Sequence, residues 1–193
     1  MLSQQFNEAL TWATDLHKNQ DRKTSKSPYI AHLLSVAGLV LESGGSEEQA
    51  MPKARFAHAA LLHDSIEDQG VTVEEIASRF SQEVANLVDA VTESYSHPKP
   101  EWSERKKGYL DKLRNSTREA VLISLADKLH NARALEEGLH THGEEMWEKF
   151  FKSRKHETSW FYRELMVVYR DKEFEDNWLF IELDRLLQRI FIE

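Results

Sequence analysis

Apolar residues recur at intervals of three and four along most of the chain, which is the spacing of one face of an α-helix. The first such run predicts an amphipathic helix over about residues 3–19, whose apolar face comprises Phe6, Ala9, Leu10, Ala13 and Leu16. A second apolar run starts at Pro28, a residue that suits the first turn of a helix, and ends at Gly44 and Gly45. No run alternates with the period of two that a strand requires, so the pattern predicts an all-α fold.

Later helix starts carry a capping signal, a serine or threonine followed by acidic residues. A helix is expected from Ser46, with an interruption at Pro52, through the most polar motif of the chain to Gly70. Thr72 and Ser81 are each expected to open a short helix. These signals place the polar motif near the end of a helix.

A proline-rich break at residues 97–100 precedes a charged helix over residues 101–113. The next helix, capped by Ser116 and Thr117, is almost continuously apolar from residue 121 to 129, which indicates a central, buried helix. Two or three packing helices are expected over about residues 143–193. Because the chain shows no repeat or Pro/Gly-rich linker, it predicts a single helical domain over residues 1–193, with about nine to eleven helices and no significant sheet.

Composition narrows the functional classes. The chain has 193 residues and no cysteine, which excludes disulfides, thiolate metal sites and a cysteine nucleophile. Acidic residues outnumber lysine and arginine by 33 to 25, and a net charge of −8 argues against a nucleic-acid polymer as partner. Neither a signal peptide nor a membrane-length apolar run is visible, so we expect a cytoplasmic protein without a membrane partner. The oligomeric state stays open, a homo-oligomer included.

The densest cluster of polar chemistry is the segment His63-Asp64-Ser65-Ile66-Glu67-Asp68, which directly follows the apolar residues 59–62. On a continuous helix His63 would lie over Glu67, and Asp64 over Asp68. A histidine and carboxylates beside a run that requires burial are costly without a partner, and a metal cation would be that partner. The alternative is a polar helix end with solvated acids.

Two further residues extend this cluster into a candidate metal site. His32 lies one turn inside the helix that starts at Pro28, and Asp127 interrupts the predicted buried helix. His32 alone is equally compatible with a satisfied core or surface histidine, and Asp127 with a salt bridge. Together with His63 and Asp64 they form a set of two histidines and two carboxylates, which suits Mn²⁺, Fe²⁺ or Zn²⁺.

The order of these residues resembles the metal-binding pattern of the HD phosphohydrolase superfamily. Three longer blocks are similar to the hydrolase domain of Rel/SpoT proteins and to their free-standing relatives, the small alarmone hydrolases, which include the metazoan SpoT homologue. The blocks are Gln20-x-Arg22-Lys23 through Pro28-Tyr29-Ile30-x-His32, Ala59 through Asp68, and Leu125-Ala126-Asp127-Lys128-Leu129-His130-Asn131-x-Arg133. The resemblance covers about residues 5–135.

This resemblance implies an Mn²⁺-dependent pyrophosphohydrolase that removes the 3′-diphosphate from guanosine tetra- and pentaphosphate. It implies metal binding by His32, His63, Asp64 and Asp127. Glu67 and Asp68 match the acidic pair that positions and deprotonates water, and Arg22, Lys23 and Asn131 match substrate contacts.

Arg105 and Lys106 are further candidates for phosphate contacts, with a solvated helix face as the alternative. The aromatic run at residues 160–162 is a candidate for stacking on a purine, although aromatics at helical spacing are more often core. Ala134 stands where the related domains carry a threonine, which leaves the base and the phosphate pattern open. Other interpretations are hydrolysis of an adenosine-based alarmone or a deoxynucleoside monophosphate, and an HD-like module that binds an alarmone without cleaving it.

Overall fold

A computed structural model describes residues 3–43, 53–95, 98–152 and 154–191. Within these residues the chain is all-α and contains no strand beyond an isolated bridge between Asp21 and Pro28. The helices are α1 (Gln4–His17), α2 (Ile30–Ser43), α3 (Lys53–Leu62), α4 (Ser65–Gln69), α5 (Val73–Arg79), α6 (Gln82–Val91), α7 (Trp102–Arg114), α8 (Arg118–His142), α9 (Glu145–Phe151), α10 (Lys155–Asp171) and α11 (Trp178–Ile190). The expected all-α fold is confirmed.

The capping predictions are confirmed where the structure describes them. The side chains of Thr72, Ser81 and Thr117 each accept a hydrogen bond from the backbone N–H three residues later, at 3.1–3.4 Å. These bonds satisfy N–H groups that the first turn of a helix leaves free. The predicted stop at Gly44 and Gly45, the start at Ser46, the interruption at Pro52 and the beginning of the 97–100 break lie outside the described residues.

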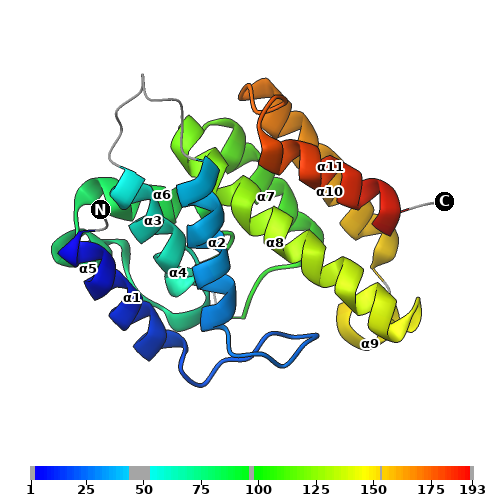
Figure 1. Cartoon of the computed structure of the whole chain (residues 1–193), viewed down its shortest axis with the longest axis horizontal. Helices are drawn as coiled ribbons and strands as arrows, with labels where there is room; N and C mark the ends of the chain where they lie inside the picture. Colours follow the sequence, from blue (N-terminus) through cyan, green and yellow to red (C-terminus); the bar gives the residue numbers. More distant parts are fainter. Residues whose placement is uncertain (1–2, 44–52, 96–97, 153, 192–193) are drawn as a thin grey trace.

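Helix α8 is the central element, as its apolar run predicted. Residues 120–127 are all buried, and the helix packs against α2, α3, α6 and α11. Figure 1 shows α1 and α3–α6 gathered at one end of the molecule and α9–α11 at the other, with α2 and α8 between them. Among the described helices, none has the length and apolar character that crossing a membrane would require.

The prediction of one continuous helix into the polar motif is wrong. Helix α3 ends at Leu62 and α4 starts at Ser65, so His63 and Asp64 form a turn between two helices. The break is stable because two side chains replace the lost backbone hydrogen bonds. His63 Nδ1–H donates to Ala60 O at 2.8 Å, and the Ser65 hydroxyl donates to Leu62 O at 2.7 Å.

Candidate functional site: a His/Asp centre beside a basic pocket

The α3–α4 turn fixes how His63 faces the protein interior. Because Nδ1 of His63 carries the proton that Ala60 O accepts, Nε2 presents a lone pair in the neutral ring. This Nε2 atom is buried and has no hydrogen-bond partner of suitable geometry. Its nearest polar neighbours are the carboxylates of Asp64 and Asp127, so the turn presents a ligand atom among groups that attract a cation.

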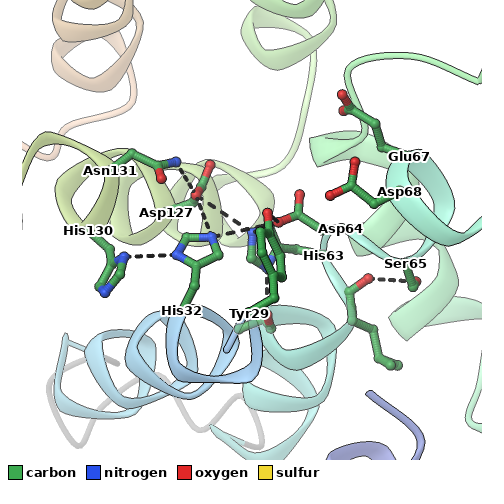
Figure 2. Close-up of polar contacts among 12 residues, drawn as sticks. Tyr29, His32, His63, Asp64, Ser65, Glu67, Asp68, Asp127, His130 and Asn131 are labelled. Carbon is green, nitrogen blue, oxygen red and sulfur yellow. Dashed lines mark hydrogen bonds and ion pairs between the residues drawn. The ribbon is translucent and has the colours of Figure 1, made fainter. Parts of the chain in front are cut away.

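The other three predicted metal ligands, His32, Asp64 and Asp127, lie around this nitrogen (Figure 2). His63 Nε2 lies 3.0 Å from Asp64 Oδ2 and 3.6 Å from Asp127 Oδ1. His32 Nε2, on α2, lies 3.2 Å from Asp127 Oδ1 and 3.6 Å from Asp64 Oδ2. Neighbouring ligands about 2.1 Å from a common ion would be separated by about 3.0–3.4 Å, so these spacings fit one metal ion.

Electrostatics also favour a cation at this position. Burial lowers the pKa of His63, but the carboxylates of Asp64 and Asp127 outweigh burial and raise it well above its usual value. Burial opposes ionisation of both acids, yet the pKa of each lies well below its usual range. His63 is the main cause for Asp64, and Lys128 is the main cause for Asp127. The acids thus remain charged. Without an ion a proton on His63 Nε2 balances them, and a divalent ion would displace that proton and supply the positive charge itself.

Further contacts orient the carboxylates. The Tyr29 hydroxyl donates to Asp64 Oδ2 at 2.7 Å, and Lys128 Nζ donates to Asp127 Oδ2 at 2.6 Å. Asn131 Nδ2 donates to Asp127 Oδ1 at 2.6 Å, while Asn131 Oδ1 accepts from Arg22 at 2.7 Å. The structure therefore places Asn131, a predicted substrate contact, between a predicted ligand and a predicted phosphate-binding arginine.

His130 is a site residue for which the sequence offered no partner. Its Nδ1 lies 2.8 Å from Nδ1 of His32, so one proton is shared between the two rings (Figure 2). Burial lowers the pKa of His130 to about 4, which keeps this ring neutral near pH 7. A neutral His130 accepts a hydrogen bond from His32 Nδ1–H, and that tautomer leaves His32 Nε2 free to bind a metal. His130 directly follows the apolar run that ends at residue 129, and no local pattern pointed to this role.

The predicted acidic pair lies on the α4 side of Asp64, away from His32 (Figure 2). Lys99 Nζ donates to Glu67 Oε1 at 2.7 Å and approaches Asp68 Oδ1 at 3.4 Å. Gln20 Nε2 donates to Asp68 Oδ2 at 2.8 Å. Both acids are partly exposed, so water can reach them. The contacts from Lys99 and Gln20 join segments far apart in sequence, and no local pattern indicated them.

A cavity of about 390 Å³ adjoins the centre. Arg22, Lys23, Lys106 and Asn131 line it, as does Lys128. The predicted substrate contacts are thus brought together, with one exception.

Arg105 does not line this cavity. Its guanidinium donates to Glu93 and to Pro100 O, and Glu93 also accepts from Lys106. Of the aromatic run, Phe161 and Tyr162 line the cavity, whereas Trp160 does not. Lys106 packs over the Phe161 ring at 4.5 Å, so this wall of the cavity combines a cation with an aromatic face.

Comparisons with known proteins identify the family of the chain. The chain matches the HD domain family over residues 9–152. It is 41% identical over 129 residues to guanosine-3′,5′-bis(diphosphate) 3′-pyrophosphohydrolase MESH1 of Xenopus tropicalis, covering 66% of this chain and 68% of that protein. It is 36% identical over 132 residues to MESH1 of Homo sapiens, covering 68% of this chain and 69% of that protein.

A longer bacterial protein and a solved structure match as well. A probable guanosine-3′,5′-bis(diphosphate) 3′-pyrophosphohydrolase of Synechocystis is 37% identical over 132 residues, which are 66% of this chain but 16% of that protein. A solved structure described as "A metazoan ortholog of SpoT hydrolyzes ppGpp and plays a role in starvation responses" superposes with a TM-score of 0.77 at 26% identity. The superposition covers 100% of this chain and 99% of that one.

Proposed function

The chain belongs to the HD-domain family and to its guanosine-3′,5′-bis(diphosphate) 3′-pyrophosphohydrolase branch, and we propose that it hydrolyses guanosine tetra- and pentaphosphate. The products are GDP or GTP and pyrophosphate. One observation supports this best: His32, Asp64 and Asp127 surround the buried Nε2 of His63, beside an acidic pair and a cavity lined by cations. These are the parts that phosphoryl transfer to water requires.

Our proposal assigns a divalent metal to His32, His63, Asp64 and Asp127, with Mn²⁺ preferred and Fe²⁺ or Zn²⁺ as alternatives. When bound, such an ion polarises a phosphoryl oxygen and makes water a better nucleophile near neutral pH. Tyr29, Lys128 and Asn131 hold the two carboxylates, and His130 holds His32.

The remaining chemistry falls to the acidic pair. Glu67 and Asp68 orient the attacking water and accept its proton. The water oxygen bonds to the phosphorus attached to the ribose 3′-oxygen, the bond from phosphorus to that oxygen breaks, and the 3′-oxygen leaves with a proton. Pyrophosphate therefore carries the new oxygen atom.

Cations in the cavity account for the selectivity toward a highly charged nucleotide. Arg22, Lys23 and Lys106 provide positive charge to a substrate that carries several phosphates, and this local charge offsets the acidic character of the whole chain. A cytoplasmic location and a small-molecule partner, without a nucleic-acid polymer or a membrane, are part of this proposal.

Product analysis by ion-exchange chromatography tests the assignment. Metal-stripped protein is mixed with ppGpp, with and without Mn²⁺, beside parallel tubes of pppGpp, ppApp and dAMP. We expect GDP and pyrophosphate from ppGpp only with Mn²⁺. Cleavage of ppApp or dAMP in place of ppGpp would contradict the substrate assignment, and the absence of turnover with Mn²⁺, Fe²⁺ and Zn²⁺ would favour a binding module.

A further inference from the structure

Gln20 belongs to the Gln20-x-Arg22-Lys23 motif, and the proposed mechanism leaves it without a role. Its side chain bridges the end of α1 and the catalytic helix α4. Gln20 Oε1 accepts from His17 Nδ1–H at 2.8 Å and from Gln69 Nε2 at 2.6 Å. Gln20 Nε2 donates to Asp68 Oδ2 at 2.8 Å.

These contacts fix the orientation of the Gln20 amide. In the reversed orientation the NH₂ group would face the donors of His17 and Gln69, and the oxygen would face the Asp68 carboxylate. The backbone is held as well, because Gln20 O accepts from Tyr29 N–H at 2.8 Å. The His17 ring stacks on Tyr29, with ring centres 5.2 Å apart and planes 14° apart, so the donor to Gln20 has little freedom.

We propose that Gln20 is a positioning residue, which holds the Asp68 carboxylate by its Oδ2 atom and turns Oδ1 toward the attacking water. Lys99 Nζ approaches this Oδ1 atom at 3.4 Å, a longer contact than the 2.8 Å bond from Gln20. This inference rests on the proposed function, in which Asp68 accepts the proton of that water. Gln20 thus acts through Asp68, and His17 and Gln69 act through Gln20.

Gln20→Glu is the sharpest test because it keeps the shape of the side chain and replaces the donor with a carboxylate oxygen. Two carboxylates at this distance share a proton, so the variant needs a higher pH for an ionised Asp68. We expect kcat at neutral pH to fall by about 10–100-fold, with KM changed by less than about 3-fold, since misplacing a catalytic group costs about that much. The acid limb of the kcat profile moves to higher pH.

A direct readout does not depend on turnover. The carboxyl ¹³C signal of Asp68 in the metal-free protein is titrated by NMR in wild type and Gln20→Glu, and the midpoint is expected to rise by about one pH unit or more. A raised midpoint in a protein that hydrolyses no nucleotide would overturn the proposed function, and with it the catalytic purpose of Gln20, while the hold of Gln20 on the Asp68 carboxylate would stand.

Two further variants complete the experiment. Gln4→Glu makes the same change at the surface, where Gln4 Nε2 donates to Glu8 Oε1 at 3.0 Å, and it should retain wild-type rates. Gln20→Met removes the donor without adding a charge, so kcat should fall at every pH if circular dichroism shows a folded protein. An unchanged Asp68 titration in Gln20→Glu, or a raised KM with wild-type kcat, would overturn the inference; the latter would indicate a direct substrate contact.

Discussion

Lys128→Met removes the cation that lies closest to a proposed metal ligand. Lys128 Nζ donates to Asp127 Oδ2 at 2.6 Å, and the side chains of Lys128 and Asp127 are 14% and 9% exposed. Burial lowers the pKa of Lys128, but Asp127 outweighs burial and raises it well above its usual value. Both groups are therefore charged in the folded protein. Lys128 Nζ also lies over the Tyr109 ring at 5.0 Å, so methionine, which keeps an unbranched side chain of similar length, removes the charge from both contacts.

Removing one member of a buried ion pair costs about 3–5 kcal/mol, because the other charge stays buried without its partner. Asp127 retains the bond from Asn131, so we expect the free energy of unfolding to fall by about 3 kcal/mol, the low end of that range. The assay is urea unfolding of metal-stripped protein, followed by circular dichroism, at neutral pH.

Lys112→Met is a matched control. Lys112 also packs over a tyrosine, Tyr95, at 4.8 Å, and pairs with Asp89 at 3.4 Å, but these partners are far more exposed. A surface pair contributes less than about 1 kcal/mol, so the control should lose little stability. Similar losses in the two variants would refute the claim that Asp127 is a buried, charged ligand.

Added Mn²⁺ should partly compensate for the missing lysine, because the ion supplies positive charge to the same carboxylate. At a free Mn²⁺ concentration of about 100 times Kd, the wild type gains about 2.7 kcal/mol. At that same free concentration, Lys128→Met should gain more. An equal or smaller gain would mean that Lys128 and the metal do not compete for Asp127.

Three further predictions concern single residues around the centre. Glu67→Ala and Asp68→Ala should each abolish turnover while Mn²⁺ still binds, and full residual activity in both variants would rule out the assigned mechanism. His130→Phe removes the acceptor of His32 Nδ1–H and should weaken Mn²⁺ binding by about 10–100-fold in a calorimetric titration, whereas unchanged affinity would contradict that role. Burial opposes ionisation of Glu93, but the nearby lysine and arginine side chains lower its pKa in the folded protein. The ionised Glu93 therefore stabilises the fold above its unfolded pKa of about 4.3, and this stabilisation is lost as pH falls through the lower pKa of the folded protein. In urea unfolding from pH 3 to 7, the stability difference between wild type and Glu93→Gln should shrink toward the acid end, and a constant difference would contradict the pairing.

Local sequence signals predicted the parts of the fold that depend on neighbouring residues. The caps at Thr72, Ser81 and Thr117 need only a hydroxyl three residues before an N–H group, and all three formed. The buried helix α8 followed from an almost continuous apolar run. In both cases the determining interaction lies within one or two helical turns.

The α3–α4 turn escaped prediction because neither glycine nor proline marks it. Side-chain hydrogen bonds from His63 and Ser65 end the helix, and each residue alone is compatible with a helix interior. The contacts of His130 with His32 and of Gln20 with Asp68 bridge 98 and 48 positions, so only the fold brings them together. The proposed ligand set came from family resemblance, which, unlike helical periodicity, carries information about distant residues, and the structure brings its four residues together.

The central claim is that His32, His63, Asp64 and Asp127 hold one divalent ion on which hydrolysis depends. Its most direct test adds Mn²⁺ stepwise to metal-stripped protein, with bound ion measured by electron paramagnetic resonance and pyrophosphate release from ppGpp measured in the same samples. We predict that activity rises in proportion to bound Mn²⁺ and stops rising at one ion per chain, and that His63→Ala shows neither binding nor turnover. Full turnover by the stripped protein, or by His63→Ala, would contradict the account.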